Sequence, residues 1–452
     1  MSSRIPVSVS ASRVLATVAG AVALAVGIAD VGPWASAGLP VAGGILLGAA
    51  VLFWVGVILQ RRPGRSGRWW IGSAAVSALT AGVIHLAVGG GAAGSVPAAL
   101  GVASAILALI PAAGRRWTPP AFGARRLGGA VGVTVIVLAG MTAAGAAAVS
   151  APCSFPRVSA SGLDVSSTGP SSGAGMRPSG TARATDGTRL AYYAFAPAHP
   201  IASLVFFHGS GANSTLGYLG FGHALAESGV AAYLFDVRGH GASGGPRGDT
   251  PSPGQLVSDT STAVGVASRA HPGLPVFVGG HSAGAGIVLN SAASLGSRVR
   301  GYVLVAPDFG LHSDTESVAD ASNFATVCQP PLVAATLSNG LVDAHRDAVA
   351  FAYTPAQVRS GLIPRYTAAM AIGQNVTDAR GILSRLRHPV GVWIGSRDEV
   401  FDPARVAAFA HAAPQRLLTT SIVPGATHLS VLDGVGGDVG QWIREHARIG
   451  GD

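Results

Sequence analysis

The sequence contains no lysine, and charged residues of all kinds make up only 11% of its 452 residues. Because soluble globular proteins carry about 25% charged residues, this scarcity argues against a wholly soluble protein. A hydrophobic content of 49% and a mean hydropathy of +0.45 argue as strongly against a disordered chain. The two cysteines lack the number and spacing of a zinc or redox site, so we expect neither a metal nor a cofactor.

The formal net charge of +9 is unevenly distributed along the chain. Residues 1–150 hold ten arginines and one acidic residue, whereas residues 151–452 hold 20 arginines and 20 acidic residues. For the chain as a whole, such a basic balance would suggest a nucleic-acid partner. Because the entire excess lies in the apolar first third, we interpret it as a signal of membrane topology and expect no nucleic-acid partner.

Long uncharged runs occupy the same first third and predict a bundle of about five transmembrane helices, since a span needs about 20 mostly apolar residues. Eight arginines lie in two of the connecting loops, and the other two loops have none. Arginine-rich loops face the cytoplasm, so everything after residue 150 is predicted on the outer side of the cell membrane, with membrane lipid as a partner. The predicted spans lie near residues 14–33, 39–60, 69–89, 95–114 and 128–150.

Two features of this region leave alternatives open. Ala35-Ser36-Ala37 resembles a signal-peptide cleavage site, and cleavage there would leave four spans with the same side for the C-terminal region. Asp30 and His85 would suit a polar site or a transport pathway. At 1.5 Å per residue, however, each lies about 25 Å from the cytoplasmic end of its span, so we interpret both as residues near the outer interface.

The composition changes after residue 150. Residues 151–180 are rich in Ser, Gly and Pro, which is typical of a flexible linker. Over residues 181–450, short apolar runs alternate with helix-like segments, and this predicts a doubly wound α/β domain with a mostly parallel sheet. The predicted strands are 188–195, 202–207, 231–235, 275–279, 301–306, 389–394 and 417–423, and the predicted helices are 214–228, 254–270, 283–294, 403–413 and 437–448.

Residues 308–387 interrupt this alternation and are predicted to form an inserted cap over the strand ends. Helical tendencies occur within it at Ala348–Tyr353, Pro355–Ser360 and Arg365–Ile372. Scattered polar residues and apolar patches make up the rest of this segment.

The segment Gly280-His281-Ser282-Ala283-Gly284 fits the pattern G-x-S-x-G. It follows a predicted strand directly and opens a predicted helix, which is the context of a nucleophile elbow. The glycines permit a tight turn that raises the serine above the sheet. Ser282 is therefore the predicted nucleophile, whereas the alternative reading is a Gly/Ser-rich turn.

A serine hydroxyl needs a base to accept its proton, and the base needs an acid that orients it. The last predicted strand is followed by His428, the predicted base, whereas His411 and His446 lie on predicted helices and are interpreted as surface residues. Asp398 follows the preceding predicted strand and is the predicted acid, with Glu399 and Asp402 as alternatives. Asp402 precedes Pro403 in the manner of a helix N-cap.

Acyl transfer also needs hydrogen-bond donors for the developing oxyanion. The amide that follows the nucleophile, here Ala283, is one candidate. The second is the amide of Ser210, which lies between two glycines directly after the strand 202–207. His208 precedes this loop and is interpreted as a packed histidine.

Five motifs occur in the order HGSG (208–211), FDVRGHGASGG (235–245), GGHSAG (279–284), GSRDEVFD (395–402) and GATHLS (425–430). Together they resemble the α/β-hydrolase superfamily, and most closely its branch of monoacylglycerol lipases, lysophospholipases and serine aminopeptidases. The resemblance covers roughly residues 182–448. It implies that Ser282, Asp398 and His428 form a catalytic triad and that Arg238 and His240 are structural.

We therefore expect a membrane-anchored serine hydrolase that cleaves carboxylic esters, with a small-molecule or lipid acyl substrate. The alternatives are a peptidase or acyltransferase that uses the same site, and a non-catalytic sensor or binding module. A peptidase would be favoured by an acidic cluster that binds an amino terminus, for which Asp314, Glu316 and Asp320 are candidates. Cys153 and Cys328 both fall on the predicted outer side, where a disulfide is possible. No particular oligomeric state is predicted.

Overall fold

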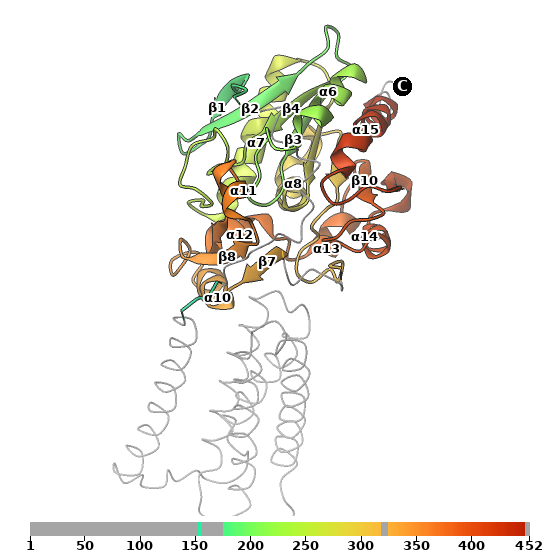
Figure 1. Ribbon diagram of the computed structural model, residues 1–452. Coiled ribbons are helices and arrows are strands. Elements are labelled where there is room, and N and C mark those ends of the chain that lie inside the picture. The colour runs from blue at the N-terminus through green and yellow to red at the C-terminus, as the bar shows by residue number, and fades with distance from the viewer. Residues whose placement is uncertain (1–151, 156–174, 318–323, 448–452) are drawn as a thin grey trace, which may run out of the picture. The chain divides into compact units, whose positions relative to one another are not determined.

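The computed structural model describes residues 152–155, 175–317 and 324–447 (Figure 1). The five predicted spans, Asp30, His85 and most of the predicted linker lie outside these residues. Among the residues that are described, no helix is both long and apolar enough to cross a membrane.

An eight-stranded sheet forms the centre of the described part, in the order β1-β2-β4-β3-β5-β6-β10-β11. The pairs β1–β2 and β2–β4 are antiparallel, and the other pairs are parallel. The prediction of a mostly parallel sheet is therefore confirmed. The strands are β1 (Gly180–Arg183), β2 (Arg189–Phe195), β3 (Ala202–Phe207), β4 (Val230–Phe235), β5 (Val276–His281), β6 (Gly301–Val305), β10 (Val390–Gly395) and β11 (Leu418–Val423).

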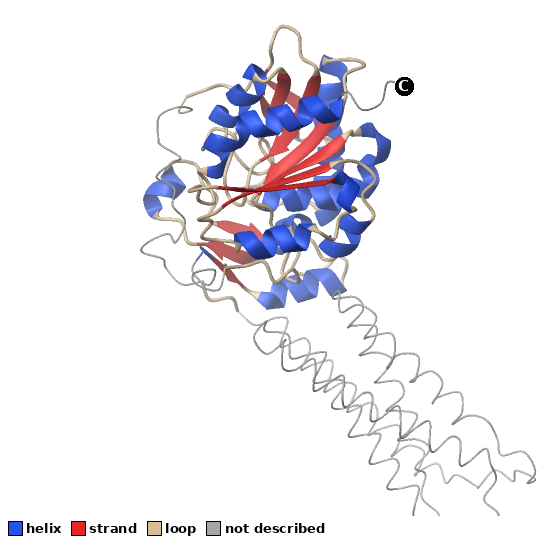
Figure 2. Ribbon diagram, turned by 90° about the vertical axis from the view of Figure 1, so that its right-hand side faces the viewer, coloured by secondary structure: helices blue, strands red, loops and turns tan. Residues whose placement is uncertain are grey.

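Helices cover both faces of this sheet, as Figure 2 shows. On one face α6 packs against α15, and on the other α7 packs against α8. The strands β3 to β6 and β10 are buried at every residue because they lie between these layers. The helices are α6 (Leu219–Glu227), α7 (Pro253–Ala270), α8 (Ala283–Leu295), α14 (Pro403–Ala410) and α15 (Val431–Ala447), with short 3-10 turns η2 (Gly296–Arg298) and η3 (Gln415–Leu417).

Helix α15 begins at Val431, earlier than the predicted start at residue 437. Glycines lower the intrinsic helix propensity of its first turns, which is why the sequence pattern placed the start too late. In the structure the same glycines allow close packing against α6. A Cβ atom at Gly436 would lie 2.5 Å from the Cβ of Ala224, and one at Gly440 would lie 2.3 Å from the Cβ of Ser228.

The cap contains a second, three-stranded antiparallel sheet in the order β7-β8-β9. The prediction of a helix over Ala348–Tyr353 is wrong, because this segment forms the central strand of that sheet. Residues 365–372 begin as a strand and only then become helical, whereas a helix does form within Pro355–Ser360. The cap elements are β7 (Ala325–Val327), α10 (Gln329–Leu337), β8 (Asp347–Phe351), α11 (Pro355–Arg359), β9 (Arg365–Thr367), α12 (Ala368–Gln374) and α13 (Ala379–Ser384).

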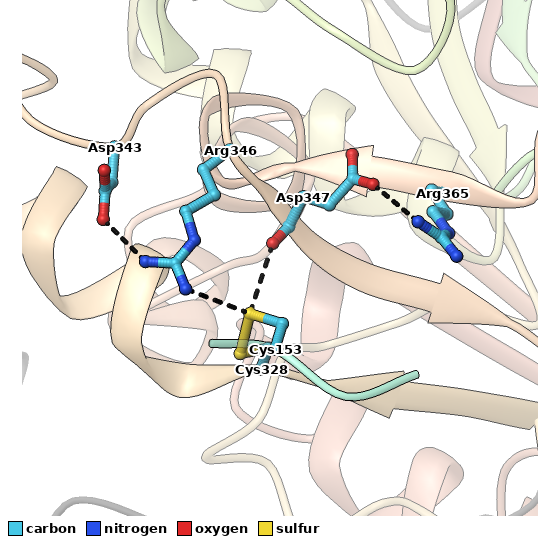
Figure 3. Close-up of a disulfide and its surroundings, with 6 residues drawn as sticks. All are labelled: Cys153, Cys328, Asp343, Arg346, Asp347 and Arg365. Carbon is cyan, nitrogen blue, oxygen red and sulfur yellow. Dashed lines mark hydrogen bonds and ion pairs between the residues drawn. A yellow bond between two sulfur atoms is a disulfide. The ribbon is translucent and has the colours of Figure 1, made fainter. Parts of the chain in front are cut away.

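A disulfide joins Cys153 to Cys328, 175 positions apart, and so ties the short segment 152–155 to the start of α10 (Figure 3). The guanidinium of Arg346 lies beside it, with Nη2 3.8 Å from the Cys153 sulfur and Nη1 3.0 Å from Asp343 Oδ2. The carbonyl oxygen of Asp347 is 3.5 Å from the same sulfur. This last approach is a polar contact, since a disulfide sulfur has no hydrogen to donate.

Candidate active site

Ser282 lies at the sharp turn between β5 and α8. Its backbone φ is 55°, a value that residues other than glycine rarely adopt. The flanking glycines make this turn possible. A Cβ atom at Gly280 would lie 2.2 Å from the carbonyl carbon of Gly284, and one at Gly284 would lie 2.4 Å from the Phe207 oxygen. The Ser282 amide donates to the Val305 oxygen at 3.0 Å, which attaches the turn to the neighbouring strand β6.

The ring of His428 and the carboxylate of Asp398 form a buried hydrogen bond, with 2.9 Å between Nδ1 and Oδ2. The other carboxylate oxygen of Asp398 accepts from the amides of Val400 at 2.9 Å and Phe401 at 2.8 Å. These two bonds fix the carboxylate, so that its remaining oxygen faces the imidazole. Of the three acids considered from the sequence, Asp398 is the one whose carboxylate contacts this ring.

The two alternative acids have other partners. Asp402 is the N-cap of α14, and its Oδ1 accepts from the amides of Ala404 at 2.9 Å and Arg405 at 3.0 Å. Glu399 accepts from the backbone amide of His428 at 3.0 Å and therefore contacts the loop that carries the histidine.

The charge of Asp398 changes the acid–base behaviour of His428. Burial alone would lower the pKa of the His428 ring, but the adjacent Asp398 carboxylate outweighs burial and raises this pKa above its ordinary value. The hydrogen bond to Asp398 places the proton of the neutral ring on Nδ1, which leaves Nε2 as an acceptor.

A chain of hydrogen bonds joins the loop of His428 to the loop after β3. His281 Nε2 lies 2.9 Å from the backbone oxygen of His428, and its Nδ1 lies 2.9 Å from the hydroxyl of Tyr218. That hydroxyl accepts from the Gly209 amide at 2.8 Å. Burial lowers the pKa of His281 well below its ordinary value, so the ring is neutral. It therefore donates from Nε2 to the carbonyl and accepts the Tyr218 proton at Nδ1.

A cavity of about 250 Å³ brings these parts together, and both Ser282 and His428 line it. Ser210 lines the same cavity. Ala283 is the first residue of α8, where amide groups lack an intrahelical acceptor. The full set of lining residues comprises Gly209, Ser210, Ala212, Leu216, Tyr218, His281, Ser282, Phe324, Tyr353, Ala356, Gln357, Ser360, Leu362, His428 and Leu429.

Of the acidic cluster considered for a peptidase, the two described members, Asp314 and Glu316, do not line this cavity. Asp314 is almost fully exposed and pairs with Arg405 at 3.1 Å, and Glu316 forms a backbone bridge with Phe401. Asp320 lies outside the described residues. Within the described part of the chain, no group of three or more His, Cys, Asp or Glu residues is placed to hold a metal ion.

The remaining residues considered from the sequence have structural surroundings. Arg238 is buried and pairs with Asp259 at 2.5 Å and with Asp186 at 2.8 Å. His411 caps the end of α14 and is exposed. The prediction that His446 is a surface residue is wrong in part, because its ring is half-buried against Trp442, 4.4 Å between ring centres.

A family model described as "Serine aminopeptidase, S33" matches residues 198–434. The chain belongs to this family. It is 27% identical over 253 residues to a monoacylglycerol lipase of Mycolicibacterium smegmatis, a match that covers 55% of this chain and 86% of the relative. It is 24% identical over 261 residues to the monoglyceride lipase of Homo sapiens, which covers 56% of this chain and 85% of that protein.

Among solved structures, a soluble variant of monoglyceride lipase from Saccharomyces cerevisiae matches with 18% identity and a TM-score of 0.44, covering 61% of this chain and 98% of that one. The ferulic-acid complex of Est1E from Butyrivibrio proteoclasticus matches with 18% identity and a TM-score of 0.45, covering 59% of this chain and 99% of that one. Family membership and the curated relatives make this chain an ester-hydrolysing serine hydrolase with an α/β-hydrolase fold.

Four residues that the sequence reasoning did not select lie close to the candidate site. His281 belongs to the GHSAG motif, and its position next to the nucleophile Ser282 could have indicated a role at the site. Tyr218, Tyr353 and Tyr366 belong to no motif, and all three contact the backbone of the loop Gly209–Gly211.

Proposed function

We propose that Ser282, His428 and Asp398 act as a catalytic triad that cleaves carboxylic esters of lipid-like alcohols, of the monoacylglycerol type. The observation that carries this proposal is the buried hydrogen bond between His428 and Asp398 beside a cavity that Ser282 also lines. The proposal is further supported by the positions of Ser282, Asp398 and His428, which follow β5, β10 and β11. Open α/β sheets bind their ligands at the carboxyl ends of such strands.

In this mechanism His428 Nε2 accepts the hydroxyl proton of Ser282 while Oγ attacks the ester carbonyl. The carbonyl oxygen becomes an oxyanion, which the amides of Ser210 and Ala283 stabilise. Collapse of the intermediate expels the alcohol, which takes the proton from His428 and leaves an acyl-Ser282 ester. Water then attacks this ester with His428 again as the base, and the carboxylic acid and free Ser282 result.

The walls of the cavity support an apolar acyl substrate. Leu216, Phe324, Leu362 and Leu429 line it, and none of the lining residues that the structure describes is acidic. Ligand cavities for drug-sized molecules span about 300–1,000 Å³, so a cavity of about 250 Å³ suits one short acyl chain or part of a longer one. The names of the curated relatives favour a glycerol ester over other esters.

The decisive experiment compares wild-type protein with Ser282→Ala on monoacylglycerols of several chain lengths, p-nitrophenyl esters and aminoacyl p-nitroanilides. We expect ester hydrolysis to fall by about 10⁵–10⁶-fold and fluorophosphonate labelling to disappear. Ser294→Ala, at an exposed position of the same helix α8, is the matched control and should keep full activity. Unchanged ester hydrolysis in Ser282→Ala would refute the mechanism, and preference for the anilides would favour a peptidase.

We further propose that residues 1–150 anchor the enzyme as a multi-pass membrane protein whose hydrolase domain lies outside the cytoplasm. The arginine distribution and the five uncharged runs support this topology. An alkaline phosphatase fused after residue 452, which is active only outside the cytoplasm, should be active in the full chain. Moving four arginines from the loop 61–68 into the loop 89–94 should reduce that activity, and an inactive wild-type fusion would contradict the topology.

A further inference from the structure

The loop Gly209–Gly211 has three backbone N–H groups and three carbonyls, and nearly all of them have a partner. Gly209 donates to Tyr218 Oη at 2.8 Å, and its carbonyl accepts from His208 Nδ1 at 2.9 Å and from the Ala212 amide at 3.2 Å. The Ser210 carbonyl accepts from the Tyr353 hydroxyl at 2.7 Å. Gly211 donates to Tyr366 Oη at 2.5 Å and accepts from the Ile363 amide at 2.7 Å.

Within the described part of the chain, the Ser210 N–H is the group of this loop that is left without an acceptor. A peptide unit is planar and trans, so its N–H points opposite to its C=O. His208 and Ala212 hold the Gly209 carbonyl and thereby orient the peptide unit that carries the Ser210 N–H. The next peptide unit, from the Ser210 carbonyl to the Gly211 N–H, is the one that Tyr353 and Tyr366 hold, so Ser210 is fixed from both sides. His208 itself is held by the Val237 amide, which donates to its Nε2 at 3.0 Å.

Three of these contacts come from the cap. Tyr353 follows β8, Ile363 precedes β9, and Tyr366 lies within β9. The hydroxyl proton of Tyr366 goes to His240 Nε2 at 2.8 Å, because His240 already donates from Nδ1 to the Arg238 carbonyl at 2.8 Å. The Tyr366 oxygen is therefore free to accept from Gly211. Burial lowers the pKa of His240 to about 3, so this ring stays neutral and the direction of the chain is fixed.

The cap can approach the loop closely at Gly211 because this residue has no side chain. Gly211 has a φ of 66°, and a Cβ atom there would lie 2.6 Å from the Ile363 oxygen and 2.7 Å from the Tyr353 ring. The sequence has seven tyrosines, and three of them, Tyr218, Tyr353 and Tyr366, bind this one loop. Such a concentration on a few backbone groups indicates a positioning role.

We propose that Tyr353 and Tyr366 are positioning residues through which the cap holds the Ser210 amide as an oxyanion donor. The cap then contributes to the chemical step as well as to substrate selection. This inference rests on the proposed function, since it assumes an oxyanion that forms at Ser282.

The test is Tyr366→Phe in the full chain, because Tyr366 does not line the cavity and its ring is kept. A small displacement of a catalytic donor costs roughly tenfold to a hundredfold in rate. We expect such a loss in kcat, of equal size on p-nitrophenyl acetate and p-nitrophenyl butyrate, with KM unchanged. The inhibition constant of butylboronic acid, which forms a tetrahedral adduct with a serine, should rise in parallel. Tyr233→Phe, a buried tyrosine of β4, is the matched control and should behave as wild type.

A loss that appears in KM alone, or that depends on acyl chain length, would show that the tyrosine only shapes the acyl pocket and would overturn the inference. Unchanged kcat in Tyr366→Phe would overturn it as well. If Tyr366→Phe does not fold, Tyr353→Phe provides the second variant, with the same chain-length-independent loss of kcat expected. Ser282→Ala separates the two proposals: if it stays active, the proposed function fails, and if it is inactive while both tyrosine variants are normal, only this inference fails.

Discussion

The two walls of the cavity are built in different ways. The wall from the large sheet carries Ser282 and His428 on short turns that follow β5 and β11. A backbone bond to Val305 fixes the first turn, and the side chains of Glu399 and His281 bind the second.

The wall from the cap carries Phe324, Tyr353 and Leu362 on segments beside its short strands and helices. A disulfide joins the cap to the segment 152–155, and tyrosine hydroxyls bind it to the loop after β3. Chemistry that needs a fixed geometry therefore lies on the sheet wall. The cap packs on the domain through α12, which contacts α7 and α8, and it adds a disulfide and tyrosine hydrogen bonds that can be removed singly.

The largest effect should come from the sheet wall. Asp398→Asn keeps the shape of the side chain but removes the charge that orients and stabilises the His428 ring, and we expect kcat to fall by about 10³–10⁴-fold. Asp402→Asn is the control, since asparagine caps a helix as well as aspartate and α14 should be unaffected. Steady-state ester hydrolysis measures both variants, and equal losses in the two would remove the distinction between these acids.

On the cap wall, the double variant Cys153→Ser/Cys328→Ser should lower the free energy of unfolding by about 2–4 kcal/mol, because the disulfide closes a long loop. Phe324 lies close in sequence to Cys328 and lines the cavity, so KM should rise more than kcat falls. Thermal unfolding of the full chain in detergent gives the stability. A thiol reductant should shift wild type toward the double variant and leave the double variant unchanged. A kcat loss as large as that of Asp398→Asn would erase the contrast between the walls.

The pH dependence sharpens the description of the sheet wall. His428 must be neutral to accept a proton, so kcat/KM should be lost as the pH falls through the pKa of this ring. Because Asp398 raises that pKa, the midpoint of the acid limb should lie above the ordinary histidine value of about 6.5. Asp398→Asn should move the midpoint to lower pH in the residual activity, whereas Asp402→Asn should not. An unmoved midpoint would mean that another group controls the acid limb.

The smallest effect should follow from Asp314→Asn, which removes an exposed ion pair with Arg405. Such pairs contribute about 0–1 kcal/mol, and asparagine tolerates the positive φ of this position. We expect wild-type ester kinetics and a melting temperature close to that of wild type. A change in the turnover of aminoacyl p-nitroanilides would instead indicate that the acidic cluster binds an amino terminus.

The same contrast explains what the sequence could predict. The strand predicted at 202–207 coincides with β3, and the elbow at Ser282 follows from glycines that no other residue can replace sterically. Both depend on residues that are neighbours in the sequence, so an apolar run or a glycine spacing is enough to predict them. The position of Asp398 at the end of a predicted strand likewise favours it over Asp402 as the acid.

The cap shows where such reading fails. In the segment Ala348–Tyr353 every residue is apolar, so its periodicity distinguishes neither helix nor strand. The segment becomes β8 because it pairs with β7 and β9, which lie elsewhere along the chain. The tyrosines that bind the loop Gly209–Gly211 cannot be predicted from a sequence pattern for a related reason. Their partners are backbone groups 143 and 155 positions away for Tyr353 and Tyr366, and backbone groups leave no trace in a sequence pattern.

The disulfide also turns residues 153–328 into a closed covalent ring. Ser282 lies inside this ring, whereas Asp398 and His428 lie beyond it. Synthesis proceeds from the N-terminus, so the ring can close around the nucleophile before the ribosome has made the base that activates it. A backbone cut inside the ring, for example by trypsin at the exposed Arg247, leaves the two pieces covalently attached, and in a denaturant only a reductant separates them.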